Sequence, residues 1–199
     1  MVKRLPAFLV SLTFLGGMLC CAKKVDIHHT TFTKADSVTD IYLSLHDSVL
    51  RSWNMMIHDD NQKLKAMRNL LHELQVTSSS DSLGVYDEKL DHLKESRYDV
   101  QSMSDRNVIQ QYDQLSRQLT SDIISIAEER SEFEYNTTLQ KLVQEIRIAD
   151  QRIDLFKSEY DAITKKFNTF LQANKNYLSE VGQKDSLGVR PLFHSSASD

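Results

Sequence analysis

The fold of this chain is decided by residues 139–181, which read LQKLVQEIRIADQRIDLFKSEYDAITKKFNTFLQANKNYLSEV. Apolar side chains recur in this stretch at alternating steps of three and four residues, and Asn174 is the one strongly polar member of the series. The series consists of Leu139, Leu142, Ile146, Ala149, Ile153, Phe156, Tyr160, Ile163, Phe167, Phe170, Asn174, Tyr177 and Val181. This spacing places every member on one face of an α-helix. We therefore predict a long helix whose apolar seam packs against other helices in near-parallel alignment.

Capping patterns predict where the two longest helices begin. Ser131 and Glu134 have the spacing of a capping box and open a last helix of roughly 50 residues, which would exceed about 70 Å at 1.5 Å per residue. Ser37 and Asp40 form a weaker version and open a first helix of about 40 residues. The apolar stripe of the first helix is broken at Asp60 and consists of Tyr42, Leu45, Val49, Trp53, Met56, Leu64, Met67, Leu71 and Leu74.

Two shorter helices are predicted between the long ones. Residues 77–82, TSSSDS, form a loop and cap before a second helix, whose apolar face consists of Tyr86, Leu90, Leu93 and Val100. Ser104 and Asp105 offer the cap of a third helix, whose stripe consists of Val108, Tyr112, Leu115, Leu119, Ile123 and Ile126. The expected fold is an all-α, elongated antiparallel four-helix bundle. If Ser104 and Asp105 only kink a continuous helix, the bundle has three long helices instead.

The N-terminus has the layout of a secretory signal. Two basic residues precede an uncharged, mostly apolar run from Leu5 to Ala22 that ends in two cysteines, as in a bacterial lipoprotein signal. Cys21 fits the lipoprotein pattern better than Cys20, because the apolar Met18 lies three residues before it and a small residue lies just before it. Cys21 is therefore the predicted site of lipid attachment. An uncleaved transmembrane helix and an ordinary cleaved signal are the alternatives.

These patterns divide the chain into four parts. We expect a lipoprotein signal or membrane anchor over residues 1–21, a tether over 22–35, the helical bundle over 36–181 and a C-terminal tail over 182–199. The lipid or anchor would hold the bundle on the membrane of a bacterial cell envelope, facing the periplasm or the exterior.

The residue content argues against several kinds of chemistry. The net charge of -4, without a basic stripe, makes nucleic acid an unexpected partner. His58, Asp59 and Asp60 lie where the stripe of the first helix fails, but adjacent helical residues point about 100° apart, so three of them cannot share one metal ion. We interpret this segment as a solvated, locally loosened turn. Without a nucleophile–base pair or a glycine-rich phosphate loop, we expect no catalytic residue, no cofactor, no metal site and no enzymatic activity.

A family resemblance is carried by Trp53 with residues 66–71, by residues 160–168 and by residues 191–193, which resemble segments of the LemA family. Trp53 is followed at the family's distance by Ala66-Met67-Arg68-Asn69-Leu70-Leu71, where the family has a Leu-Ile-Pro-Asn-Leu-Val motif. Residues 160–168 resemble the family's two Tyr-Asn dipeptides seven residues apart, with Asp161 and Phe167 as substitutions, and Pro191-Leu192-Phe193 resembles its aromatic finish. The family's basic run in the first helix is replaced here by residues 61–63, NQK. The resemblance implies an antiparallel helical bundle anchored at its N-terminus, and it implies no particular reaction.

Three functions from different classes fit these features. The leading expectation is a membrane-tethered, non-catalytic envelope protein whose bundle serves as an interaction or scaffolding module for other envelope proteins or for a second copy of itself. The second is an envelope bundle that senses a ligand or a metal through His58, Asp59 and Asp60, or through the loops after the first and last helices. The third is a holdase-type chaperone, which ranks last because such proteins tend to be basic and this chain is acidic.

Overall fold

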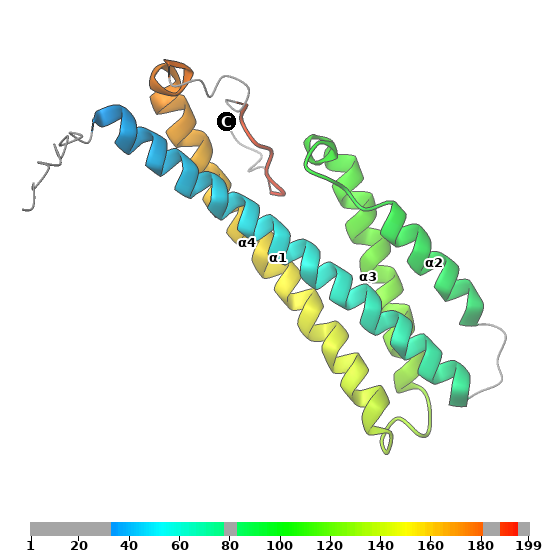
Figure 1. Cartoon of the computed structure of the whole chain (residues 1–199). Helices are drawn as coiled ribbons and strands as arrows, with labels where there is room; N and C mark the ends of the chain where they lie inside the picture. The colour runs from blue at the N-terminus through cyan, green and yellow to red at the C-terminus, as the bar shows by residue number, and fades with distance from the viewer. Residues whose placement is uncertain (1–32, 78–82, 181–187, 195–199) are drawn as a thin grey trace, which may run out of the picture. The chain divides into compact units, whose positions relative to one another are not determined.

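The computed structural model describes residues 33–77, 83–180 and 188–194, and it is all-α within these ranges (Figure 1). The helices are α1 (Lys34–Thr77), α2 (Gly84–Glu95), α3 (Arg106–Glu128) and α4 (Thr137–Glu180), with a short 3₁₀ turn, η2 (Ser102–Ser104). The predicted four-helix bundle is confirmed. The three-helix alternative is wrong, because ten residues and a new cap separate α2 from α3. The predicted signal, with Cys21, lies outside the described residues.

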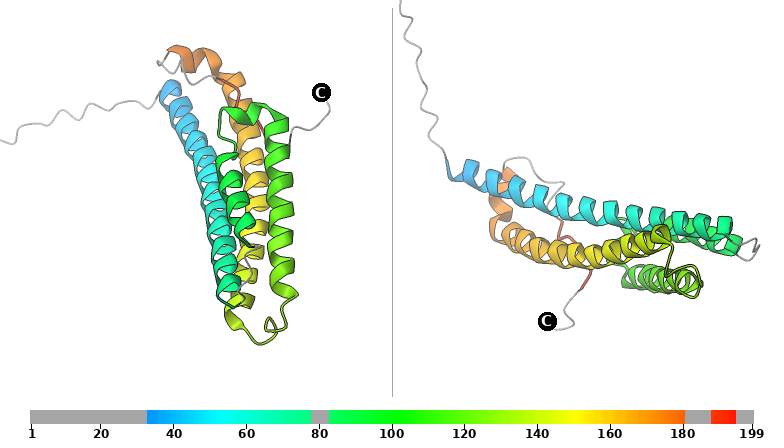
Figure 2. Two further views of the ribbon diagram at one scale, coloured as in Figure 1. Left: turned by 90° about the vertical axis from the view of Figure 1, so that its right-hand side faces the viewer. Right: turned by 90° about the horizontal axis from the view of Figure 1, so that it is seen from below.

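The two long helices form an antiparallel pair along most of their length, and the last turns of α4, drawn orange, bend across the start of α1 (Figure 2). Lys34 of α1 lies over the ring of Tyr177, Tyr42 contacts Phe167, and further along α1 the partners on α4 continue to fall in residue number. Each long helix has 44 residues, or about 66 Å at 1.5 Å per residue, against 12 residues for α2 and 23 for α3. The shorter pair packs against one half of α1 and α4, so the long helices extend past it (Figures 1 and 2).

Helix α1 begins earlier than its sequence suggests. The Thr33 amide donates to Asp36 Oδ2 at 2.8 Å, and the Asp36 amide donates to Thr33 Oγ1 at 3.1 Å, which makes a reciprocal capping box. The hydrogen bonds from Thr33 hold the pKa of the Asp36 carboxyl below its usual range. The predicted cap at Ser37 is wrong, because the Thr33 pair satisfies the first free amides one turn earlier.

Helix α4 also begins at a different cap, whereas α3 begins where predicted. Residues 131–135 form turns, and Asn136 Oδ1 accepts hydrogen bonds from the amides of Thr138 and Leu139 at 3.0 and 3.1 Å. The helix start predicted from Ser131 is therefore wrong, because its hydroxyl bonds the Glu132 side chain instead of a helix amide. For α3, Asp105 accepts from the Asn107 amide at 2.9 Å, so that predicted cap is confirmed.

The buried face of α4 agrees with the predicted stripe over its first part and shifts beyond Phe156. In the later part Tyr160 and Phe167 are buried as expected, while Tyr177 is 38% exposed. The additional buried residues of α4 are Val143, Lys157, Asp161, Thr164, Leu171 and Leu178. Two of these positions are covered by elements other than α1, since Lys157 pairs with Asp113 of α3 and Asp161 binds the C-terminal segment. On α2, the predicted Val100 lies beyond the helix end and is exposed, and Tyr98 is buried instead.

Candidate functional site

Three charged residues of α1 are buried in the middle of the bundle. Asp59, Asp60 and Lys63 expose 2%, 4% and 3% of their surface, and α1 runs through them without interruption. The interpretation of this segment as a solvated, loosened turn is therefore wrong. The apolar stripe does stop here, but paired charges take its place. A protein interior accepts charged groups where opposite charges and hydrogen bonds compensate for lost hydration.

Asp60 points toward α3 and the chain that follows α2. Its Oδ2 accepts hydrogen bonds from Arg97 Nη1 at 2.8 Å and from the Tyr112 hydroxyl at 2.5 Å. Arg97 donates in addition to Asn61 Oδ1 at 2.8 Å. These bonds fix the segment between α2 and α3 against α1, at the end of the four-helix part of the bundle.

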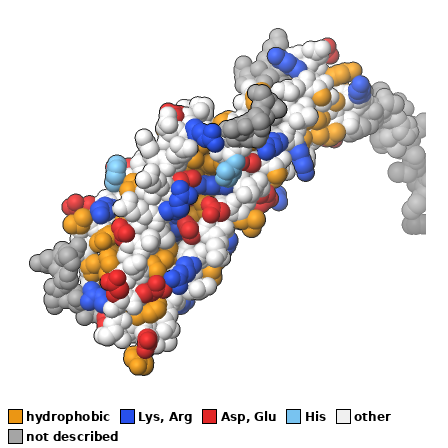
Figure 3. Space-filling view, turned by 180° about the vertical axis from the view of Figure 1, so that it is seen from behind, with side chains coloured by type: hydrophobic (Ala, Val, Ile, Leu, Met, Phe, Trp, Pro, Cys, Tyr) orange, Lys and Arg blue, Asp and Glu red, His pale blue; other side chains and the backbone are white. Residues whose placement is uncertain are grey.

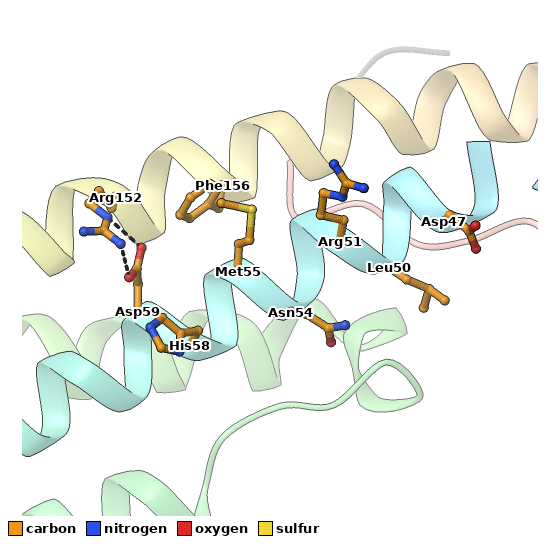
Figure 4. Close-up of a pocket in the computed structure, with 9 residues that line it drawn as sticks. All are labelled: Asp47, Leu50, Arg51, Asn54, Met55, His58, Asp59, Arg152 and Phe156. Carbon is orange, nitrogen blue, oxygen red and sulfur yellow. Dashed lines mark hydrogen bonds and ion pairs between the residues drawn. The ribbon is translucent and has the colours of Figure 1, made fainter. Parts of the chain in front are cut away.

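Asp59 points the other way, toward α4. Its two carboxylate oxygens accept from Nε and Nη2 of Arg152, a two-pronged pairing that fixes the orientation of the guanidinium group (Figure 4). One turn further along α1, Lys63 donates to Asp150 Oδ1 at 2.9 Å and to Ser116 Oγ at 2.7 Å. Each buried charge of α1 therefore has a partner on another segment.

A fourth ion pair completes this polar layer, which we define as Asp59, Asp60 and Lys63 with their partners and the pair of Lys157 and Asp113. Lys157 is 6% exposed and donates to Asp113 Oδ1 at 2.6 Å. The hollow among these groups has a volume of about 40 Å³, which has room for a few water molecules at most. Little free space therefore remains among Asp60, Lys63, Asp113 and Lys157.

The polar layer also changes the acidity of two tyrosines. Burial raises the pKa of the Tyr98 hydroxyl well above its usual range, and the charges of Asp113 and Asp60 raise it further. Burial raises the pKa of the Tyr112 hydroxyl in the same way, with the charge of Asp60 as the next cause. Both hydroxyls therefore stay protonated in the folded protein at neutral pH.

The side chains of His58, Asp59 and Asp60 do not converge on one point. His58 is exposed, Asp59 is paired with α4, and Asp60 is paired with Arg97 and Tyr112. Within residues 33–77, 83–180 and 188–194, no group of three or more His, Cys, Asp or Glu side chains is placed to hold a metal ion. Asp59 and Asp60 belong to a packed ion-pair network instead, and the exposed His58 is not one of its members.

An open hollow of about 500 Å³ lies between α1 and α4 on the surface (Figure 4). Its lining consists of Asp47, Leu50, Arg51, Asn54, Met55, His58, Asp59, Arg152 and Phe156. Met55 and Phe156 point toward one another across it. A second hollow shares His58, Asp59 and Arg152 with the first and continues along the same two helices past Ile148. We call the two together the α1–α4 groove.

Apolar side chains remain exposed along the α1–α4 groove. Leu50, Met55 and Ile148, which line the groove, are 37%, 43% and 42% exposed. Charged groups are interspersed with apolar patches on the face of the molecule drawn in Figure 3, and neither sign of charge is gathered there. The lining of the groove itself carries both signs of charge, since Asp47 and Asp59 lie there with Arg51 and Arg152.

The C-terminal segment, residues 188–194, packs against α4 through side chains that bind its backbone. Asn168 donates from Nδ2 to the Arg190 carbonyl and accepts from the Arg190 amide, both at 2.9 Å. The buried carboxylate of Asp161 accepts from the amides of Phe193 and His194 at 2.7 and 2.8 Å, and it also pairs with His194 Nδ1 at 2.9 Å. The segment therefore lies along α4 in a fixed register, drawn red in Figure 1.

Phe193 fills an aromatic box that we define as Trp53, Tyr98 and Tyr160. The Phe193 ring is stacked on Trp53 with centroids 6.2 Å apart and lies edge-on to Tyr98 and Tyr160 at 5.5 and 5.3 Å. Lys157 Nζ lies 5.5 Å from the centroid of the same ring. Phe193 is 6% exposed, so the C-terminal segment contributes one side chain to the core.

Most of this arrangement has no counterpart among the residues that the sequence predicts to be functional. Lys157 and Asp161 are absent from the predicted core, because apolar periodicity passes over charged residues. A usable signal is present, since Asp161 and Asn168 each follow an aromatic residue and stand seven residues apart, which places them two turns apart on one helix face. Arg97 has no comparable signal, because its partner Asp60 is 37 residues away in sequence.

Comparison of the chain with protein-family models, with curated proteins and with solved structures gives no match. In the part of the chain that the structure describes, each helix falls short of the length or apolar character that a membrane span needs. The family resemblance, the lipid at Cys21 and the membrane location therefore stay predictions.

Proposed function

We propose that this protein is a membrane-tethered helical bundle of the bacterial cell envelope that acts by binding another protein rather than by catalysis. The observation that carries the proposal is the α1–α4 groove, where Leu50, Met55 and Ile148 stay exposed although the Asp59–Arg152 pair beside them is satisfied. An open groove between two long helices suits a third, amphipathic helix, whose apolar face covers the exposed side chains.

The partner's chemistry follows from the rim of the groove. Arg51 is exposed, and the Asp47 side chain is 77% exposed, with His46 Nδ1 at 3.7 Å from its carboxylate. A partner helix with one acidic and one basic residue beside its apolar face could pair the acidic residue with Arg51 and the basic residue with Asp47. Such rim charges contribute mainly to association rate and register.

Two further observations support the tethered, LemA-like part of the proposal. Residues 5–22 and Cys21 have the pattern of a lipoprotein signal. In addition, two of the segments that carry the family resemblance meet in space: Asp161 and Asn168 bind the backbone of the chain around Pro191-Leu192-Phe193. We therefore propose a divergent LemA-like protein whose residues 160–168 hold its C-terminal segment in place.

The groove can be tested by site-specific photo-crosslinking of the full-length chain in a bacterial host. A photoreactive amino acid is placed at Leu50 or Ile148 in the groove, and the matched control carries it at Val85, an apolar residue of α2 that is 53% exposed. We expect one discrete crosslinked protein from the two groove positions and none from Val85. In the Leu50 variant, Met55→Arg should remove the product, because a charge in the apolar part of the groove is costly to cover.

Two results would contradict the groove as the binding surface. One is an equal yield of the same product from Val85, and the other is a product that survives Met55→Arg. A crosslinked product with twice the mass of the chain would identify the partner as a second copy, which is the self-association form of the same proposal.

A further inference from the structure

The surface that holds the C-terminal segment has the features of a peptide-binding site. Asn168 and Asp161 bind four main-chain groups. Asn168 binds the carbonyl and the amide of Arg190, and Asp161 binds the amides of Phe193 and His194. Any residue except proline supplies such amides. Recognition of an extended chain by main-chain hydrogen bonds, with pockets for selected side chains, is a recurrent mode of peptide binding.

The selectivity of the site comes from two side-chain contacts. Phe193 is enclosed by the aromatic box, and the Arg190 guanidinium lies 5.1 Å over the ring of Phe167. The site therefore favours an aromatic residue preceded, three positions earlier, by a basic one.

Most residues of the segment lie at least partly at the surface. Of residues 188–194 only Phe193 is buried, and Gly188, Val189 and His194 are exposed. The segment has no helix or strand of its own, so its binding does not depend on internal structure. Elements with few buried contacts open at low free-energy cost compared with global unfolding.

We propose that the aromatic box, Asp161 and Asn168 form a binding site for an extended peptide of another protein, and that the chain's own residues 190–194 occupy this site as an internal competitor. The ligand class is an extended peptide with a basic residue three positions before an aromatic one. The site shares no residue with the lining of the α1–α4 groove. The inference therefore goes beyond the proposed function and does not depend on it.

The competition can be measured on the full-length protein with Phe193→Asp, which removes the anchor from the tail and leaves the site intact. The probe is a synthetic peptide with the sequence of residues 188–194, GVRPLFH. Trp53 is the only tryptophan of the chain and stacks on Phe193, so its fluorescence reports occupancy. Phe193→Asp should shift the emission of Trp53 to the red, and the peptide should restore it.

Matched controls separate binding in the site from unspecific association. The wild type should bind the peptide at least about tenfold more weakly than the Phe193→Asp variant does, because its own tethered tail competes at high effective concentration. A peptide with alanine in place of Phe193 should leave the Trp53 emission unchanged. Adding Asp161→Ala to Phe193→Asp should weaken peptide binding about tenfold or more, since two amides lose their acceptor.

The proposal is overturned if the Phe193→Asp protein is folded but does not bind the peptide. Cooperative unfolding followed by circular dichroism shows whether the variant is folded. If this variant does not fold, Phe193→Ala is the milder substitute, and absence of peptide binding to it overturns the proposal equally. Concentration-dependent dimerisation of the wild type that Phe193→Asp abolishes would also overturn it, because the occupant would then be the tail of a second copy.

Discussion

Asp60 is the residue that most changes how the first helix is understood. Its carboxylate is 4% exposed and accepts from both Arg97 and Tyr112, so a charge stands where the apolar stripe predicts a side chain such as leucine. Removal of one partner of a buried pair leaves the other without compensation, and this usually costs more than the intact pair contributes.

Asp60→Ala should therefore lower the free energy of unfolding by about 3 kcal/mol, because the Arg97 charge and the Tyr112 hydroxyl lose their acceptor. The matched control is Asp91→Ala, which removes the exposed pair with Arg68, whose side chains are 65% and 50% exposed. That change should cost about 1 kcal/mol or less. Guanidinium unfolding followed by circular dichroism measures the loss of stability in both variants. Equal losses would show that the buried pairing of Asp60 stabilises the fold no more than the exposed pair does.

The buried tyrosines predict a loss of stability in alkali. Burial raises the pKa of Tyr98 and Tyr112 above the value of about 10 in the unfolded chain. The folded chain then keeps protons that the unfolded chain releases, so this contribution is fully present below about pH 10 and is lost as the pH rises further.

Above about pH 10, each of the two tyrosines should lower the free energy of unfolding by about 1.4 kcal/mol per pH unit. Denaturant unfolding at a series of alkaline pH values measures the slope. Tyr98→Phe should reduce this slope by about 1.4 kcal/mol per pH unit, which is the contribution of one tyrosine. Tyr135 is 83% exposed, so Tyr135→Phe should leave the slope unchanged. A slope that Tyr98→Phe does not alter would contradict the assignment.

At the scale of the elements, the helix starts show competition among neighbouring caps. Two candidate caps stand five residues apart before α4, Ser131 and Asn136, and both match N-terminal preferences. The structure uses Asn136, whose Oδ1 accepts from two free amides, while Gln140 Nε2 holds the carbonyls of Phe133 and Glu134 in the preceding turn. The turn therefore has its own hydrogen bonds and does not need to join the helix.

Asn136→Ala should lower the free energy of unfolding by about 1 kcal/mol, since it leaves two amides of the first turn without their acceptor. Ser131→Ala should change it by about 0.5 kcal/mol or less, because the Ser131 side chain is exposed and caps no helix. Thermal or denaturant unfolding of the two variants decides between the caps. A larger loss of stability from Ser131→Ala than from Asn136→Ala would instead support the capping box that the sequence predicts at Ser131.

At the scale of the whole molecule, the proposed tether determines where the bundle acts. If Cys21 carries a lipid, the full-length chain expressed in a bacterial host should be recovered with the membrane. Its intact mass should equal that of residues 21–199 plus a diacylglyceryl or triacyl group. Cys21→Ser should then release the protein or leave the precursor unprocessed, while Cys20→Ser should still be lipidated. An unprocessed wild-type chain that stays in the membrane would favour the spanning anchor instead.

Most of the secondary structure could be predicted from the sequence because it depends on local spacing. The stripes of α1, α3 and α4 and the cap at Asp105 follow from residues within one or two turns of each other. The candidate sites could not be predicted in this way. Asp59 and Arg152 are 93 residues apart, and Asp161 and Phe193 are 32 apart, so no local pattern joins them.

The sequence by itself determined the helical class and the greater length of the first and last helices, because apolar periodicity and the lack of proline act along the chain. The choice between three and four helices was made only by the structure, which separates α2 from α3. Only the tertiary structure decided which polar residues are buried, where the C-terminal segment docks and which faces of α1 and α4 stay open. The physical reason is that a buried charge such as Lys157 or Asp161 is stable only beside its partner. Packing of the helices brings those partners together.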